Sequence, residues 1–585
     1  METPSGEQKK DMQKQLRTQP EKPIDNESSS EDDNVEELSN IESEEEAYDI
    51  VEDVEQSTES EEEGPAHAST QKTISLASNE SFSEEDNIDE LSAIESEEET
   101  YDVVENIEQQ AESEEKAGHA SMRGTKSLAS RFMYSANYFK WSVTPPTEEE
   151  TEADKVPDYE SEVLSDAKNM DTPMDVWSLL FTDEMLSKIV KYTNAEMGRK
   201  RKTCKGKLLF QLLDINLEEL KALIGIFYFC GLKKENSTNV KKLWKPDHET
   251  PIYRSTMTQI RFEYLMALLQ FDDKSTRQER RQSDRLAPIR DLWDSFISNC
   301  TKYYSPGKNV TIGEQVVSFQ GKCSFRVKMG PYHEQLGLRI VMMNDSDTYY
   351  MINAIPHVGK DDKRPQKSMP SYYVRKLSEP IYDSHRNITC NKRFTSVPLV
   401  QSMKNKCSLS MVGTIRAKEK EIPLEIKKFT EINDSRFLYA DNVTLLSYCP
   451  KQNKIILVLS SSSLHKRGDA VVEKEQQIIE FYNSTKGGTD RFDQLCHEYS
   501  TARKSHRWVM KLFYAMLDQS FTNSYILHNL NKKNNTKLTK SEFLKTLAKQ
   551  LYIPHIKRRL LHGKGFTEKF RKLMEGVIKG ENSES

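Results

Sequence analysis

Two aspartates in the C-terminal half of the chain have the spacing of a paired carboxylate site. Asp490 and Asp493 are three residues apart, so in a helix both carboxylates lie on one face. Divalent cations such as Mg²⁺ prefer anionic oxygen ligands of this kind. The pair is therefore a candidate metal site; the structural alternative is that both residues only cap and solvate the helix.

Three short segments, far apart in the chain, together resemble the catalytic core of the piggyBac transposases. They are Val310–Gln315 (VTIGEQ), Arg386–Phe394 (RNITCNKRF) and Tyr482–Gln494 (YNSTKGGTDRFDQ). In that family, which is part of the RNase H-like superfamily, the segments read T-I-D-E-Q, I-T-C-D-N and K-G-G-x-D-x-x-D-Q. One aspartate from each segment holds the metal ions. The resemblance also includes FTDEMLSKIVKYTNAE from Phe181 and extends to about residue 550.

The family's three metal-binding positions are Gly313, Asn391 and Asp490 in this chain. DNA strand transfer needs two metal ions held so that the attacking and leaving oxygens are both stabilised. Glycine offers no side-chain ligand and asparagine only a neutral carbonyl. Glu314 does not replace them, because successive side chains of a strand point to opposite faces. The resemblance therefore implies Mg²⁺ in the ancestral type of site, whereas here we expect no intact catalytic site and no cofactor.

Asp345 and Asp347 follow a predicted strand close to this site. They are possible replacement ligands, but a D-S-D turn explains the pair more simply.

A basic segment after the third motif is the main candidate for DNA contact. Arg503, Lys504, Arg507 and Trp508 (ARKSHRW) resemble the family's R-K-x-x-R-W, in which cations meet phosphates and the ring stacks on a base. The alternative for Trp508 is ordinary core packing. Further basic clusters are Arg199–Lys202 and Lys557–Arg559, which suit nuclear import, DNA contact or solvated surface.

One stretch is expected to lower the affinity for DNA. The family's P-N-K-P-x-K-x-G corresponds here to residues 330–337, and Tyr332 and Gln335 replace its two lysines. Each lost phosphate contact weakens binding with little regard to sequence.

The net charge of −10 hides a divided chain. Residues 1–170 carry about 48 acidic and 13 basic side chains, or about −35, whereas residues 171–585 carry about 45 acidic and 70 basic, near +25. This division is typical of a body that binds polyanions and of an acidic tail that competes for its basic surface. The alternative is a solvated acidic arm that has no effect on the body.

The acidic segment 1–130 is poor in aromatic residues and is predicted to be disordered. It contains a tandem repeat, since the stretch from Ser28 returns from Ser81, and two copies make a duplicated tail rather than a solenoid. Each copy has a serine before three glutamates (Ser43, Ser96), where phosphorylation would add charge.

Each repeat also has a short β-prone run, at 48–52 and at 101–105. Such a run can add a strand to the sheet edge of a protein partner; the alternative is that its apolar residues are incidental.

Cysteine usage indicates a reduced, intracellular protein. The eight cysteines include no C-x-x-C pair, and none follows Cys496. We therefore expect no zinc and no C-terminal cysteine-rich module of the kind that the family usually carries. The longest apolar run, residues 222–232, is too short to cross a bilayer, so no membrane partner is expected.

Hydrophobic periodicity predicts helices that start at Thr182 and Asn216 and others over 258–271 and 288–304, in a region expected to be all helical. Alternation predicts strands at 310–315, 338–343, 349–355, 386–390 and 455–459. The fold class is mixed α+β or α/β: an RNase H-like domain with an insertion, flanked by helical dimerisation and DNA-binding segments. The expected parts are a disordered tail (1–130, repeats at about 28–78 and 81–130), a helical dimerisation and DNA-binding region (131–308), the RNase H-like domain (309–414 and 477–496) around an insertion (415–476), a helical DNA-binding segment (497–555) and a basic tail (556–585).

The resulting hypothesis is a transposase derivative that has lost cleavage and acts in the nucleus as a dimeric protein that binds double-stranded DNA or chromatin. The acidic tail would recruit protein partners or temper the binding. Two alternatives stay open: an active transposase or nuclease that uses Asp490 with recruited acidic ligands, and a dimeric interaction scaffold with no DNA role.

Overall fold

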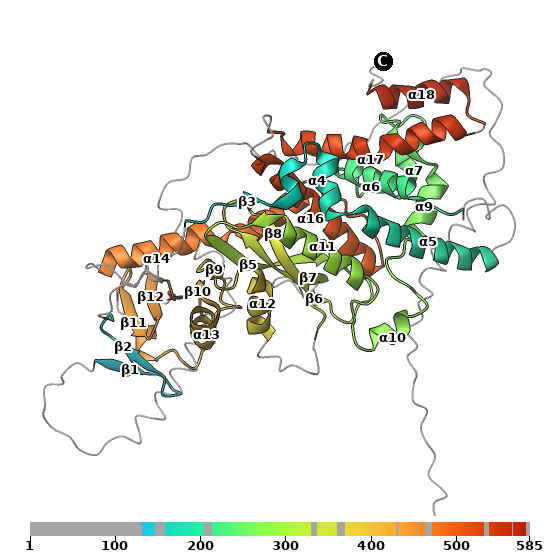
Figure 1. The fold of residues 1–585 in the computed structure, drawn as a ribbon. Helices are drawn as coiled ribbons and strands as arrows, with labels where there is room; N and C mark the ends of the chain where they lie inside the picture. The colour runs from blue at the N-terminus through green and yellow to red at the C-terminus, as the bar shows by residue number, and fades with distance from the viewer. Residues whose placement is uncertain are drawn as a thin grey trace, which may run out of the picture. The chain divides into compact units, whose positions relative to one another are not determined.

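A computed structural model describes residues 131–146, 158–203, 213–328, 336–359, 369–428, 431–452, 454–462, 471–531, 537–563 and 565–580 (Figure 1). The acidic segment 1–130, with its repeats, lies outside these residues, as do Tyr332 and Gln335. No helix in the described part of the chain is long and apolar enough to cross a membrane.

Several helices of the first helical region begin at capped positions, and the caps at Asn216 and Thr258 agree with the sequence prediction. Thr172 and Asp175 form a capping box at the start of α4, and Asn216 accepts a hydrogen bond from the Glu219 backbone N–H at the start of α6. Thr258 caps α9 in the same way. The helices are α4 (Pro173–Leu180), α5 (Asp183–Thr203), α6 (Leu217–Leu232), α7 (Val240–Leu243), α8 (Ile252–Thr256), α9 (Gln259–Leu268), α10 (Arg277–Arg281) and α11 (Arg290–Lys302).

An eleven-stranded sheet carries the candidate site. Its strands run in the order β1-β2-β11-β12-β13-β10-β9-β5-β7-β6, and β8 also pairs with β7. At its centre β5 is parallel to β9 and β9 is parallel to β10, while β7 is antiparallel to β5. The central strands are β5 (Asn309–Ser318), β6 (Val327–Lys328), β7 (Leu336–Asp345), β8 (Met351–Pro356), β9 (Asn387–Cys390) and β10 (Ser410–Thr414).

The insertion expected over 415–476 extends this sheet. Its strands β11 (Ser435–Ala440), β12 (Val443–Lys451) and β13 (Lys454–Ser460) form an antiparallel meander, and β13 pairs with β10. Short 3₁₀ turns occur at Ser165–Asn169, Glu379–Ile381 and Glu425–Lys427, and β3 (Glu162–Val163) pairs with β4 (Tyr304–Ser305) in a separate ribbon.

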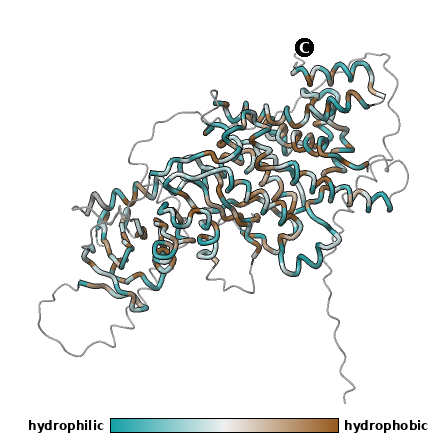
Figure 2. Tube along the Cα trace, in the orientation of Figure 1, coloured by the Kyte–Doolittle hydropathy of each residue, from teal (hydrophilic) through white to brown (hydrophobic). Residues whose placement is uncertain are grey.

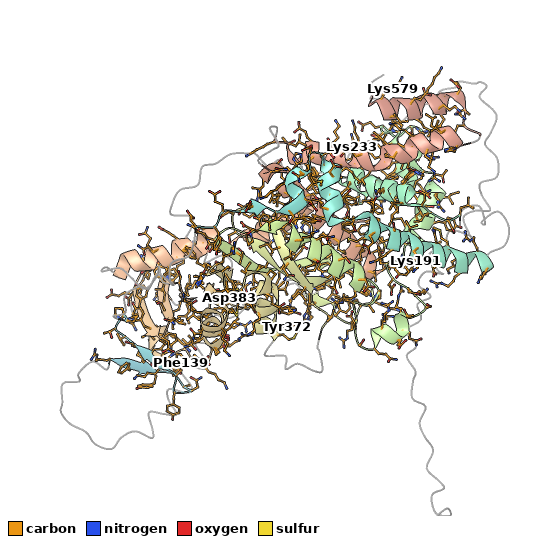
Figure 3. All side chains as sticks on the ribbon, viewed as in Figure 1. Phe139, Lys191, Lys233, Tyr372, Asp383 and Lys579 are labelled. Carbon is orange, nitrogen blue, oxygen red and sulfur yellow. The ribbon has the colours of Figure 1, made fainter. Side chains whose placement is uncertain are left out.

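The start of the region that we expected to be all helical is instead a β-hairpin. β1 (Phe132–Tyr134) pairs with β2 (Lys140–Ser142), and β2 pairs with β11 of the insertion. Trp141 is fully buried and donates its indole N–H to the Glu421 carbonyl at 2.7 Å, while Phe139, labelled in Figure 3, lies with its ring 5.2 Å from that of Trp141. The burial of this tryptophan holds the hairpin on the insertion.

The C-terminal helices pack against the first helical region and the sheet. α16 (Trp508–Leu530) is buried along most of its length; Gln519 bonds to Gln315 of β5, and Asn523 bonds to the backbone of Met351 at the start of β8. In Figure 2 the hydrophobic colour gathers in the central strands and around this helix, whereas α10 is hydrophilic. The remaining helices are α12 (Met369–Ser378), α13 (Val397–Cys407), α14 (Val471–Lys486), α15 (Gly488–Glu498), α17 (Lys540–His562) and α18 (Glu568–Lys579).

The expected basic tail from residue 556 is also corrected. α17 continues through Ile556 to His562, and α18 follows it. Ile556 and Met574 are fully buried, so apolar residues on one face of each helix fix this part of the chain to the helical region.

Candidate functional site

The three sequence segments meet at one cavity, as expected. Gly313 of β5, Asn391 directly after β9 and Asp490 in the first turn of α15 all line a cavity of about 460 Å³. β5, β9 and β10 are parallel, and the cavity lies where β9 and β10 end. Ligands bind preferentially outside the carboxyl ends of parallel strands.

The position of the first family aspartate is closed by a neighbouring side chain. A Cβ atom at Gly313 would lie 2.8 Å from Cβ, 2.9 Å from Oγ1 and 3.0 Å from Cγ2 of Thr489. Thr489 is itself held, because its hydroxyl donates to the Asn344 side-chain oxygen at 3.1 Å. The contact places α15 directly on β5, so a side chain at 313 fits only if Thr489 or the backbone of one element shifts.

The position of the second family aspartate is occupied by an exposed asparagine that forms a local turn. The Asn391 side-chain oxygen accepts the Arg393 backbone N–H at 3.0 Å, and its backbone carbonyl accepts the Thr395 hydroxyl at 3.0 Å. This is the side-chain bonding that Asn typically makes in turns. The asparagine oxygen is therefore a turn acceptor here.

Asp490 and Asp493 differ in their surroundings. Asp490 lines the cavity, where loss of water contact and the neighbouring Asp493 carboxylate raise its pKa. Asp493 is directed to other partners: it accepts from the Gln315 amide at 2.7 Å and faces His497 at 3.2 Å. Its hydrogen bond raises the pKa of His497 to about 9. The pair that the sequence singles out is thus divided between the cavity and a separate network.

The other nearby acids have structural partners. Glu314, which we expected to face away from the site, also lines the cavity, and its carboxylate pairs with Arg339 and Arg393. Asp345 is fully buried and accepts hydrogen bonds from Tyr304, Ser161 and three backbone N–H groups, those of residues 307, 347 and 348. The turn interpretation of Asp345 is confirmed.

The residues present do not fit a two-metal site. Two of the three family carboxylates are missing, Thr489 fills the space of one of them, and Asp493 is engaged elsewhere. Within the described ranges, no three His, Cys, Asp or Glu side chains are grouped to hold a metal ion. Two-metal catalysis needs a carboxylate cage that holds both ions at once. No chemical step through a metal ion is therefore derived for this cavity.

Comparison with known proteins places this geometry in a family. The sequence profile of the family described as "Transposase IS4" matches residues 172–525, which is more than half of the chain. The chain belongs to the piggyBac/IS4 transposase family. A solved structure of this family, the piggyBac transposase synaptic complex with hairpin DNA, superimposes with a TM-score of 0.67 and 33% sequence identity, over 72% of this chain and 88% of that one.

Two human proteins are similar over the same region. The PiggyBac transposable element-derived protein 3 is 21% identical over 383 residues, which are 61% of each chain. The chimeric ERCC6-PGBD3 protein matches at the same identity over 34% of its length. The chain therefore spans less than two thirds of the length of the curated relatives that it matches. The mixed α+β, RNase H-like fold expected for the piggyBac family is confirmed.

The structure separates the four residues that resemble the DNA-contacting motif of the piggyBac family. Arg503 is buried and donates to the carbonyls of Glu235 and Thr238 after α6. Arg507 donates to three carbonyls at the end of α9, those of residues 266, 267 and 269. Both arginines hold helix ends together through these hydrogen bonds, and phosphate contact by either of them stays a prediction.

The other two residues of this motif differ. Lys504 is exposed, and it is the member of the motif that is positioned for an external contact. Trp508 is half-buried and packs edge-on against Phe325, with ring centroids 5.1 Å apart. For Trp508 this favours the core-packing alternative.

Sequence reasoning missed the basic character of the cavity. Lys392 and Arg393 follow Asn391, Arg416 follows β10, and Lys486 ends α14; all four line the cavity. The NKR triplet was a visible signal for the first two. Arg416 and Lys486 are separated from them in the chain and are brought there only by the sheet topology.

Proposed function

We propose that this protein binds duplex DNA without cutting it, as a derivative of a piggyBac-type transposase. The observation that carries the proposal is the closed position at Gly313, where Thr489 takes the space that a metal-binding side chain needs. The fold around the site is that of the family, whereas two of the three carboxylates that would hold the metal ions are missing. DNA binding is supported by the solved relative, which is a transposase in complex with hairpin DNA.

The charge distribution supports the binding part of the proposal. Residues 171–585 carry an excess of basic over acidic side chains of about 25. Exposed cations suited to phosphate contact include Lys202, Lys504, Lys557 and Arg558. Arg559 of the same basic run is less suited, since it donates to the Arg254 and Ser255 carbonyls and burial lowers its pKa to about 10. Phosphate contacts of exposed cations give affinity that depends strongly on salt.

The proposal also includes a nuclear location, a homodimer and a role for the acidic segment. The clusters at 199–202 and 557–559 suit nuclear import. The acidic residues before 131 would compete with DNA for the basic surface or recruit protein partners. Removing residues 1–130 should then raise DNA affinity most at low salt, where electrostatic competition is least screened.

The deciding experiment is the binding of the purified protein to duplex DNA across a salt series, with Mg²⁺ and Mn²⁺ present and the DNA checked for nicks. The expected result is affinity that falls steeply with salt and DNA that stays intact. Absence of salt-dependent binding would contradict DNA binding and favour an interaction scaffold, and nicked products would favour an active enzyme. The Asp490→Asn variant separates true nicking from a contaminating nuclease, because only nicking by this site would stop.

A further inference from the structure

A second cavity lies in the helical part of the protein, where α17 packs on both α6 and α18 and where α18 also contacts α8 (Figure 1). Its volume is about 480 Å³, which is within the range of small-ligand sites, roughly 300–1,000 Å³. We call it the α17 pocket, because Ser541, Lys545, Lys549 and Tyr552 of that helix line it. None of its lining residues belongs to the three motif segments or to the cavity described above.

The lining of the α17 pocket carries unbalanced positive charge. Lys545 and Lys549 are one turn apart on α17, so they lie on the same face with Cβ atoms about 5–6 Å apart. Neither lysine has an ion pair or a hydrogen bond with another described residue. Lys233, at the end of α6, lies 3.9 Å from the carboxylate of Glu249, the one acidic side chain among the described residues of the lining. With three lysines against one glutamate, the lining has a surplus of two positive charges.

A buried hydroxyl adds a hydrogen-bond donor to the pocket. Tyr552 is only 1% exposed, follows Lys549 by one turn of α17, and has no hydrogen-bond partner for its hydroxyl among the described residues. Burial raises the pKa of Tyr552, so the hydroxyl keeps its proton and stays a donor. Buried polar groups in proteins are normally hydrogen-bonded, because the lost bonds to water have to be replaced. An unpartnered hydroxyl in the wall of a cavity is a group that a bound ligand can satisfy.

Much of the remaining wall is apolar. Its side chains are those of Phe229 and Leu232 in α6, Ile252 in α8 and Val577 in α18. The ring of Phe229 meets the ring of Tyr552 edge-on, with centroids 6.4 Å apart. The pocket thus combines cations and a hydroxyl donor with an apolar surface contributed by three further helices.

We infer that the α17 pocket binds a small organic anion that joins a carboxylate or phosphate head group to an apolar body. Lys545 and Lys549 hold the head group through charge-assisted hydrogen bonds, which are the strongest that side chains form. The Tyr552 hydroxyl donates a further hydrogen bond. The apolar body removes its own surface and that of the wall from water, which favours binding. The inference does not rest on DNA binding, because it concerns other residues than those of the family's site.

Lys549 has a structural alternative. Its ammonium group lies 3.6 Å from the place of a Cβ atom at Gly580, which caps the C-terminal end of α18. A cation is favourable at that end of a helix because of the helix dipole. A lysine that served only α18 would affect the melting temperature and leave ligand binding unchanged, so the test measures both.

The test uses the full chain and 2-naphthoate as the probe, with binding measured by calorimetry. Three related compounds separate the contributions: 2-naphthyl phosphate changes the head group, 2-naphthalenemethanol removes its charge, and acetate removes the apolar body. The variants are Lys545→Gln with Lys549→Gln, which removes both charges, and Tyr552→Phe, which removes only the hydroxyl. The matched control is Lys569→Gln with Lys572→Gln, two exposed lysines of α18 that do not line the pocket.

We expect the unchanged protein and the control to bind 2-naphthoate and the variant at 545 and 549 to bind it roughly tenfold or more weakly, since hydrogen bonds to charged groups contribute most. Tyr552→Phe should weaken binding roughly fivefold. It should not lower the melting temperature, because its hydroxyl has no partner to lose among the described residues. The uncharged alcohol and acetate should bind weakly to every protein, and the ratio of affinities for naphthoate and naphthyl phosphate identifies the head group.

Three outcomes overturn the inference. Equal binding of 2-naphthoate by the unchanged protein and the variant at 545 and 549 means that the lysines do not hold the anion. Equal affinity for 2-naphthoate and the uncharged alcohol, or no binding at all, means that the lysines are ordinary solvated surface. Displacement of the probe by duplex DNA means that this face belongs to the DNA-binding surface, in which case the proposed function stands and the separate site does not.

Discussion

The contact between Gly313 and Thr489 predicts that even one added methyl group at 313 destabilises the protein. In Gly313→Ala the new carbon would lie 2.8 Å from Thr489 Cβ. Carbon atoms in contact normally lie about 3.5–4.0 Å apart, so the strand or the helix has to move by about 0.7 Å. Movement of α15 away from β5 would also open the close contact between Gly488 and Thr311. Overpacking of this kind costs about 1–3 kcal/mol.

The assay is urea unfolding of Gly313→Ala alone and together with Thr489→Gly. The second change removes all three contacting atoms, whereas alanine would keep the nearest one, Cβ. We expect the alanine at 313 to lower the free energy of unfolding by about 1–3 kcal/mol with threonine at 489 and by less than about 0.5 kcal/mol with glycine there. The double-mutant cycle subtracts the helix penalty that Thr489→Gly carries by itself.

A matched control is available three residues from Asp490. Gly487→Ala adds the same methyl group where nothing lies within 4 Å, and the backbone there has a φ of −82°, which alanine adopts readily. This change should be neutral or stabilise by up to about 1 kcal/mol. If Gly313→Ala is as stable as Gly487→Ala, or if Thr489→Gly does not relieve it, the position is open and the central argument against a metal site fails.

Three further predictions test single residues. Asp345→Ala should lower the free energy of unfolding in urea by about 3 kcal/mol or more, because five donors lose their acceptor; a residue that served only as a recruited metal ligand would leave stability unchanged. The pKa of His497 is raised to about 9 by Asp493, so its pairing stabilises the fold fully below pH 6.5 and loses this effect as pH rises through 9. His497→Gln should therefore be less stable than the unchanged protein at pH 6, by less than about 1 kcal/mol because the histidine is exposed. Near pH 10 the two proteins should be equally stable; an equal loss of stability at both pH values would contradict the pairing. Lys504→Gln should reduce the slope of log affinity against log salt by about one without changing the melting temperature, whereas Arg503→Gln should lower the melting temperature because it leaves two carbonyls unpaired; the reverse pattern would restore Arg503 as a DNA contact.

The order of the motifs along the chain and local sequence signals were sufficient to predict where the site lies and where many of the helices and strands occur. Asn216 and Thr258 cap helices as the sequence predicts, because a side-chain cap is a contact between residues three apart. The three segments meet at one cavity because the order of motifs along the chain carries the topology of the family.

The features that sequence reasoning missed depend on contacts between distant residues. Arg503 and Arg507 have the composition of a DNA-binding motif, but their partners are carbonyl groups 238 to 268 residues earlier in the chain. Nothing near these arginines in sequence indicates that helix ends would approach them. A basic residue is read as exposed by default, since the charged residues are mostly at the surface.

The hairpin at 132–142 was missed for a related reason. Each of its strands has only three residues, too few to show the alternation that identifies a strand. Its pairing with β11 joins residues almost 300 positions apart, and Trp141 finds its burial site in the insertion. The closure of Gly313 by Thr489 is likewise a tertiary contact, so the missing aspartate was visible in the sequence but the filled space was not.

The β1–β2 hairpin also determines where the acidic segment is tethered. Residues before 131 enter the described fold at β1, the outermost strand, and six strand positions separate β1 from β9 beside the cavity. At about 4.8 Å per strand, this is about 29 Å measured across the sheet. A shortened chain that begins after residue 146 would lose this tether point, leave the burial site of Trp141 empty and expose the edge of β11 to pairing with other chains. The hairpin therefore covers the edge of β11. It is also the attachment point from which the acidic segment would have to reach the cavity.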